Sequence, residues 1–129
     1  MNQRFIEIDR QNRTSAIQSL HAGRERLGRA VSLWIAPEGT RSRTGKLGPF
    51  KKGGFHLAVN TGLPILPVSI DGTRRALPAH GLTVTRGALA HVVIGKPIDT
   101  AGYDGKRLSE LLTVVRKAIS DGLPAELKD

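Results

Sequence analysis

Cysteine is absent from the 129 residues of this sequence. Its absence excludes disulfide bonds, thiolate metal sites and a cysteine nucleophile. Aromatic residues are scarce as well, at 4% of the chain. Proteins that bind single-stranded nucleic acids stack the bases on aromatic side chains, and no recognised nucleic-acid docking motif occurs here. The sequence therefore predicts that nucleic acid is not a partner.

Acidic residues are few compared with basic ones. The chain has 11 Asp and Glu against 20 Lys and Arg, which gives a formal net charge of +9. A surplus of this size favours an anionic partner or substrate. By charge alone, a phosphorylated metabolite, an acidic membrane surface and nucleic acid all fit.

Long apolar runs are also lacking. No run approaches the roughly 18 to 20 apolar residues that a membrane-spanning helix needs, and residues 1–10 are too polar for a signal peptide. We therefore expect a chain that is not itself anchored in a bilayer. Its length suits one domain, covering residues 1–129.

Apolar residues recur with the spacing of strands and helices, in the pattern of an α/β domain. The predicted strands are residues 5–8, 31–35 and 65–70, followed by a hairpin of residues 82–85 and 90–94. The predicted helices begin at Thr14 or Ser15, at Lys51 and at Leu108, and the last two end before Gly62 and Gly122. Because a helix separates the strands at 31–35 and 65–70, we expect these strands to run parallel, with Trp34 in the core.

The loop after the predicted strand at 31–35 has an unusual charge distribution. It begins at Ala36 and Pro37, contains one carboxylate at Glu38, and is interrupted by glycines. Its cations are Arg41, Arg43, Lys46, Lys51 and Lys52. Cations placed this close together repel one another, and ligands of α/β sheets bind beyond the carboxyl ends of the strands. The loop is therefore predicted to bind an anion.

Residues 36–43, Ala-Pro-Glu-Gly-Thr-Arg-Ser-Arg, resemble the Phe-Pro-Glu-Gly-Thr-Arg-Ser signature of the glycerolipid acyltransferases, the 1-acylglycerol-3-phosphate O-acyltransferase family. Three further blocks resemble those of the family in order and spacing. They are residues 5–10 (FIEIDR), 50–53 (FKKG) and 66–70 (LPVSI). The resemblance is firmest over residues 5 to 75.

The resemblance implies an α/β fold with a mixed, mostly parallel sheet flanked by helices, of the glycerol-phosphate acyltransferase type. It implies transfer of an acyl group from acyl-coenzyme A or acyl-carrier protein to a hydroxyl of lysophosphatidic acid or glycerol phosphate, in phospholipid biosynthesis. No metal or bound cofactor is implied. We further expect a peripheral location at the cytoplasmic face of a membrane, where the basic surface could contact anionic lipid.

The resemblance also assigns residues to the substrate site. Arg10 and Arg41 are expected to bind the acceptor phosphate, with Lys51 as a third cation. Glu38 is expected to accept a hydrogen bond from an acceptor hydroxyl or to orient an arginine, since carboxylate and phosphate repel. The predicted substrate-binding set is Arg10, Glu38, Gly39, Thr40, Arg41 and Lys51, and the predicted wall of the acyl site is Ile65, Leu66, Pro67 and Val68.

The catalytic block of the family, His-x-x-x-x-Asp, is missing from the sequence. His21 is followed five positions later by Arg26, His56 by Thr61, His80 by Thr85 and His91 by Lys96. In the family this block precedes the one that ends here at Arg10, so we expect it, and the N-terminal strands of the sheet, upstream of Met1. Residues 1–129 are then a partial acyltransferase domain without a catalytic residue. The alternative is a non-catalytic module that binds phosphate or anionic lipid.

Overall fold

The computed structural model describes residues 18, 32–77, 81 and 83–128. The chain divides into two units, Met1–Ile35 and Ala36–Asp129. The strand predicted at 5–8, the helix predicted from Thr14 or Ser15, and Arg10 lie outside the described residues.

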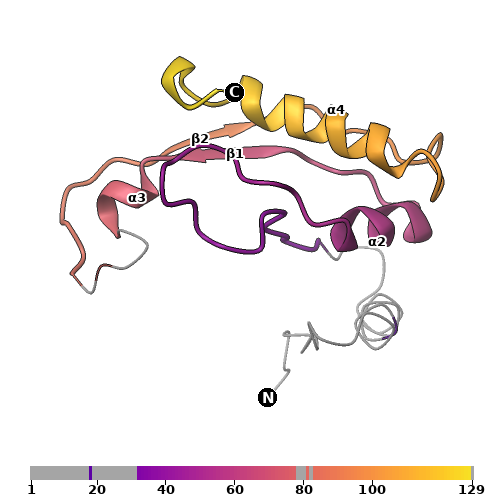
Figure 1. Ribbon diagram of the computed structural model, residues 1–129, viewed down its shortest axis with the longest axis horizontal. Helices are drawn as coiled ribbons and strands as arrows, with labels where there is room; N and C mark the ends of the chain where they lie inside the picture. The colour runs from indigo at the N-terminus through magenta and orange to yellow at the C-terminus, as the bar shows by residue number, and fades with distance from the viewer. Residues whose placement is uncertain (1–17, 19–31, 78–80, 82, 129) are drawn as a thin grey trace. The chain divides into compact units, whose positions relative to one another are not determined.

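The second unit is built from short helices and strands in the order α2, β1, α3, β2, α4, η2 (Figure 1). The α-helices are α2 (Gly53–Thr61), α3 (Thr73–Ala76) and α4 (Leu108–Asp121), the strands are β1 (Val68–Asp71) and β2 (His91–Ile94), and η2 (Ala125–Leu127) is a 3₁₀ helix. This alternation confirms the predicted α/β class.

Strands β1 and β2 pair in antiparallel fashion, with Val68 opposite Ile94 and Asp71 opposite His91. The pairing continues as an isolated bridge, in which the amides of Ile65 and Ile98 each donate to the other's carbonyl at 2.9 and 2.8 Å. Among the described residues this is the one strand pair, so the parallel part of the predicted mixed sheet is not represented there.

Two predicted strand assignments are wrong. Residues 83–85 do not form a hairpin with β2; the Thr85 amide instead donates to the Ala76 carbonyl at 2.8 Å. Residues 32–35 form no strand, and Trp34 is 72% exposed rather than buried. A strand needs a ladder partner, and no described residue pairs with residues 32–35.

The helix ends follow their local signals. Gly62 takes the left-handed conformation (φ 64°) directly after α2, and the Leu63 amide then donates to the Ala58 carbonyl at 3.1 Å. Helix α4 ends before Gly122, as predicted, and buries Leu108, Leu111 and Val115 on one face. Both predicted helices are therefore confirmed, α2 with a start two residues later than expected.

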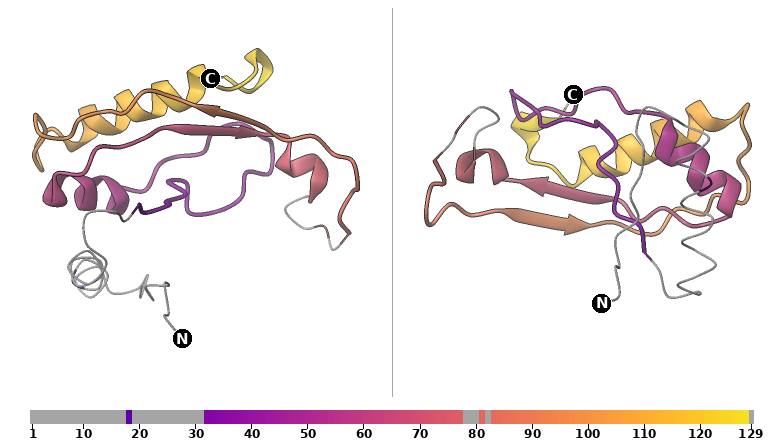
Figure 2. Two further views of the ribbon diagram at one scale, coloured as in Figure 1. Left: turned by 180° about the vertical axis from the view of Figure 1, so that it is seen from behind. Right: turned by 90° about the horizontal axis from the view of Figure 1, so that it is seen from below.

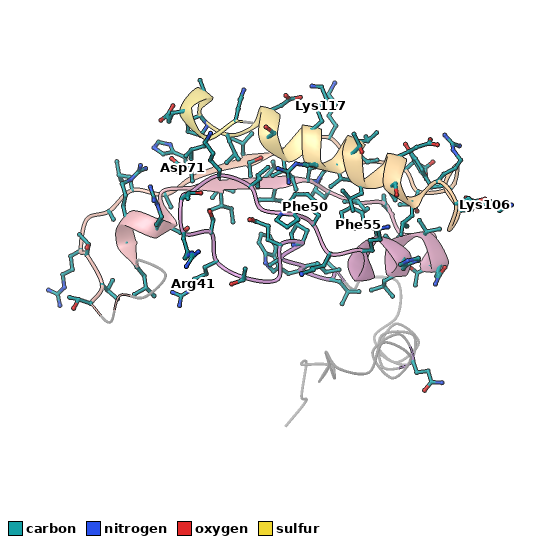
Figure 3. All side chains as sticks on the ribbon, in the orientation of Figure 1. Arg41, Phe50, Phe55, Asp71, Lys106 and Lys117 are labelled. Atoms are coloured by element: carbon teal, nitrogen blue, oxygen red, sulfur yellow. The ribbon has the colours of Figure 1, made fainter. Side chains whose placement is uncertain are left out.

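The core joins the segment before α2 to helix α4. Phe50 and Phe55 stack with their ring centroids 6.3 Å apart, and they pack with Leu108, Leu111 and Val115. Figure 3 labels both rings beneath α4. Burying these side chains together supplies the main apolar contribution to the stability of this unit.

Helix α4 contacts the sheet on one side and the charged loop on the other. The Ser69 hydroxyl in β1 donates to the Ile119 carbonyl at 2.6 Å, and the Arg116 guanidinium bonds to carbonyls of the loop. In the right panel of Figure 2 the helix lies next to the strands, and the loop of residues 36–50 passes across it. Helix α4 thus holds both parts at fixed positions within the unit.

Candidate functional site

A hollow of about 640 Å³ lies within the loop of residues 38–51. We call it the cationic hollow, because its lining contains four cations and a single carboxylate. These charged residues are Arg41, Arg43, Lys46 and Lys51, with Glu38. An anion in this hollow would be attracted from several directions at short range.

Backbone hydrogen bonds close the base of the loop. The Lys51 amide donates to the Pro37 carbonyl at 2.7 Å, and the Gly39 amide donates to the Ala36 carbonyl at 3.1 Å. Gly39 has φ 72°, and a Cβ added there would lie 3.5 Å from the Lys51 side chain. The base of the loop therefore brings Lys51 against the turn that carries Glu38 and Gly39.

The tip of the loop is held by a serine and by helix α3. The Ser42 hydroxyl accepts from the Gly45 amide at 2.9 Å and donates to the Lys46 carbonyl at 2.8 Å. Arg74 in α3 donates to the Arg43 carbonyl at 3.2 Å. These bonds fix the backbone around Arg43 and Lys46 before any ligand binds. Less of the loop then has to be ordered on binding, which favours affinity.

The Glu38 side chain links two parts of the loop by a hydrogen bond. One of its carboxylate oxygens accepts the Gly48 amide at 2.7 Å, across ten positions of sequence. A carboxylate that accepts a backbone N–H makes a charge-assisted bond, stronger than a neutral one. The roles predicted for Glu38, accepting an acceptor hydroxyl or orienting an arginine, stay predictions beside this observed structural bond.

The structure brings most of the predicted substrate-binding set together. Glu38, Gly39, Thr40, Arg41 and Lys51 all line the cationic hollow, whereas Arg10 lies outside the described residues. The lining also contains Arg43 and Lys46, which the predicted set omits.

The residues predicted to form the acyl-site wall do not line this hollow. Ile65 packs against the core, Pro67 is fully buried, and Leu66 is 51% exposed. Their assignment, with Val68, to an acyl-chain site stays a prediction.

Sequence reasoning missed Arg116. This half-buried residue of α4 donates to the Gly48 carbonyl at 2.6 Å and to the Leu47 carbonyl at 3.0 Å. It lies 68 positions from Gly48 and outside every block that resembles the family. No local sequence signal identifies such a contact.

The family model described as Acyltransferase matches residues 1–71, and the chain belongs to this family. A 1-acyl-sn-glycerol-3-phosphate acyltransferase from Cocos nucifera is 38% identical over 122 residues, which are 94% of this chain and 39% of that relative. The one from Escherichia coli K12 is 36% identical over 121 residues, 93% of this chain and 48% of the relative. These matches confirm the resemblance read from the sequence blocks.

A solved structure agrees with this assignment. The crystal structure of PlsC from Thermotoga maritima, the 1-acyl-sn-glycerophosphate (LPA) acyltransferase, has a TM-score of 0.59 and 32% sequence identity. The match covers 82% of this chain and 44% of that one. This chain thus spans between 39% and 48% of the length of these relatives.

The described part of the chain has no helix that is both long and apolar enough to cross a membrane.

Proposed function

We propose that this chain provides the acceptor site of an enzyme that transfers an acyl group to lysophosphatidic acid or glycerol phosphate. The observation that carries the proposal is the cationic hollow, where four cations and one carboxylate line a space built from the block that resembles the family signature. The names of the relatives support the same acceptor class.

The residues of the hollow suit a phosphate. The Arg41 guanidinium is planar and can bond two phosphate oxygens at once, whereas the Lys51 ammonium contributes a compact charge. The Thr40 hydroxyl can donate a further bond. The Gly48 amide donates to Glu38, and the dipole of this N–H offsets part of the repulsion between the carboxylate and a phosphate.

The chain's own residues bind and orient the acceptor in this proposal. The acyl donor is a thioester of coenzyme A or of acyl-carrier protein, and no metal or bound cofactor takes part. Proton removal from the attacking hydroxyl requires a base, and none of the four histidines has the family's aspartate five positions later. The base is therefore assigned to a His-x-x-x-x-Asp segment that this sequence does not contain.

A binding measurement tests the acceptor site directly. We expect the 129-residue chain to bind sn-glycerol 3-phosphate and lysophosphatidic acid in isothermal titration calorimetry. Arg41→Ala removes at least one hydrogen bond to a charged group, which contributes about 1.5–3 kcal/mol, so the affinity should fall by a factor of roughly 10 to 100 or more. Arg86→Ala is the matched control, since Arg86 is an exposed arginine outside the lining of the hollow.

If Arg41→Ala and Arg86→Ala lose affinity equally, the chain has no specific phosphate site. The binding would then reflect only its general positive charge. Chemistry is tested by joining the chain to a His-x-x-x-x-Asp segment and measuring acyl transfer to lysophosphatidic acid. Specific binding without transfer in that joined protein would favour the alternative, a non-catalytic module that binds phosphate or anionic lipid.

A further inference from the structure

Arg116 holds two consecutive peptide groups of the loop. Its Nη2 donates to the Leu47 carbonyl at 3.0 Å and its Nη1 to the Gly48 carbonyl at 2.6 Å. Its guanidinium carbon also lies 5.3 Å from the ring centroid of Phe50, within the range of a cation–π contact. Three contacts thus join one side chain of α4 to residues 47–50.

The peptide group between Leu47 and Gly48 is held from both sides. Its carbonyl accepts from Arg116, and its N–H donates to Glu38 at 2.7 Å. The N–H and C=O of a trans peptide point in opposite directions, so a cation on one side and a carboxylate on the other fix its plane. Rotation of this peptide would break two charge-assisted bonds at once.

The next peptide group offers an acceptor and no donor, because Pro49 has no N–H. Its carbonyl, that of Gly48, is the one that Arg116 binds at 2.6 Å. Leu47, Gly48 and Pro49 all line the cationic hollow. A carbonyl oxygen turned toward a bound phosphate would repel it, and bonding to Arg116 satisfies both oxygens instead.

We propose that Arg116 is a positioning residue for the acceptor phosphate, an inference that rests on the proposed function. It fixes the Leu47–Gly48 peptide jointly with Glu38 and thereby sets the separation of Lys46 and Lys51, which flank this segment. The core gives Arg116 a rigid base, since Val115 and Leu111 of the same helix are buried against Phe50 and Phe55.

Two measurements on the 129-residue chain test the proposal. Calorimetry gives the affinity for sn-glycerol 3-phosphate, and amide hydrogen exchange reports the order of the loop at Gly48. For Arg116→Gln we expect an affinity about tenfold lower, as for the loss of one bond to a charged group, with faster exchange at Gly48. The amides of Ile65 and Ile98, bonded in the bridge beyond β1 and β2, should keep their protection.

Two further variants separate position from charge. Arg116→Lys keeps the charge but lacks the planar fork that bonds two carbonyls, so its affinity should fall between those of the unaltered chain and Arg116→Gln. Lys117→Gln removes the neighbouring cation of α4, which pairs with Asp121 rather than with the loop. It should leave the affinity unchanged, and it should speed exchange at Gly48 no more than at Ile65 and Ile98.

A double variant tests the shared peptide. Because Arg116 and Glu38 hold the same group, the combined effect of Arg116→Gln and Glu38→Ala on affinity should be smaller than the product of the two separate effects. Independent effects would show that the two residues do not act through one peptide, and would contradict the proposal.

The proposal is overturned if Arg116→Gln binds as tightly as the unaltered chain, or if Gly48 keeps its protection. Loss of protection at Gly48, Ile65 and Ile98 together would also overturn it, because Arg116 would then stabilise the whole unit rather than the loop. Absence of phosphate binding by the unaltered chain would refute the proposed function, and exchange at Gly48 would still decide whether Arg116 orders the loop.

Discussion

Gly39 is the residue on which the shape of the loop's base depends. It follows the Glu38 turn with φ 72°, a region that costs other L-residues about 1–2 kcal/mol. The Lys51 side chain passes 3.5 Å from the position a Cβ would take. A side chain at residue 39 would therefore strain the backbone, while its Cβ would lie in ordinary van der Waals contact with the alkyl part of Lys51.

Gly39→Ala is expected to lower the free energy of unfolding by about 1–2 kcal/mol and to weaken the binding of sn-glycerol 3-phosphate. Urea unfolding and calorimetry measure the two effects. Gly105→Ala is the control, since it has no positive φ and no atom within 4 Å of an added Cβ. If the two alanine variants behave alike, the conformation of Gly39 does not matter for the site.

At the residue scale, the sequence indicated which residues lie together around the hollow better than it indicated the hydrogen bonds that hold them. Glu38, Gly39, Thr40 and Arg41 stand in one block and Lys51 in the next, and they line one hollow because the short loop between the blocks is closed on itself. The bonds of Glu38 to Gly48 and of Arg116 to the loop depend on how distant segments pack, which residue types and spacing do not encode.

At the scale of elements, the two longer helices of the described residues were predicted well and the strand pairing was not. Helices α2 and α4 are set by apolar residues and terminal glycines that are near in sequence. Strand β2 instead pairs with β1, across the residues that separate them, rather than with the adjacent residues 83–85. Neighbouring sequence favoured a hairpin, but β1 offers Val68 and Ile70 opposite Ile94 and Val92, and apolar pairs across strands stabilise a sheet.

Helix α4 ends with a carboxylate at Asp121, where the helix dipole disfavours negative charge. Lys117 lies one turn earlier and donates to it at 2.6 Å. This hydrogen bond, followed by the charge of the lysine, holds the pKa of Asp121 below its ordinary value. The pair therefore stabilises α4 when the aspartate is ionised, above its unfolded-state pKa, and this contribution is lost as the pH falls through the lower folded-state pKa.

Lys117→Gln should raise the pKa of Asp121 toward the ordinary aspartate value, which a pH titration followed by NMR of the side-chain carboxyl carbon measures. The difference in stability between the unaltered chain and the variant should be present near neutral pH and vanish in acid. Lys106→Gln serves as the control, because Lys106 precedes α4 and its side chain forms no ion pair with Asp121. If the difference in stability between the unaltered chain and Lys117→Gln stays constant as the pH falls through the acid range, the ion pair is not the cause of that difference.

At the scale of the whole molecule, the main feature is the excess of positive charge. The net charge of +9 extends beyond the cationic hollow, with exposed Arg74, Arg75 and Arg86 on or after α3. Such a surface attracts anionic lipid headgroups. This is the basis for placing the chain, as a proposal, at the cytoplasmic face of a membrane.

The chain is expected to co-sediment with vesicles containing phosphatidic acid, and less so with vesicles of phosphatidylcholine alone. Raising the salt from 0.1 M to 1 M shortens the Debye length from about 10 Å to about 3 Å, so binding to the anionic vesicles should fall several-fold. Binding that ignores both salt and lipid charge would contradict a peripheral, electrostatic attachment.

The contact between Arg116 and residues 47–48 has a genetic consequence. A nonsense codon at any of positions 111–116 would leave the four blocks that resemble the family intact, since the last of them ends at residue 70. The product of such an allele would still contain all four blocks. It would lack Arg116, the side chain that bonds to the carbonyls of Leu47 and Gly48. On the proposal made above, it would behave as a loss of acceptor binding, with its lesion more than forty codons downstream of the last recognisable block.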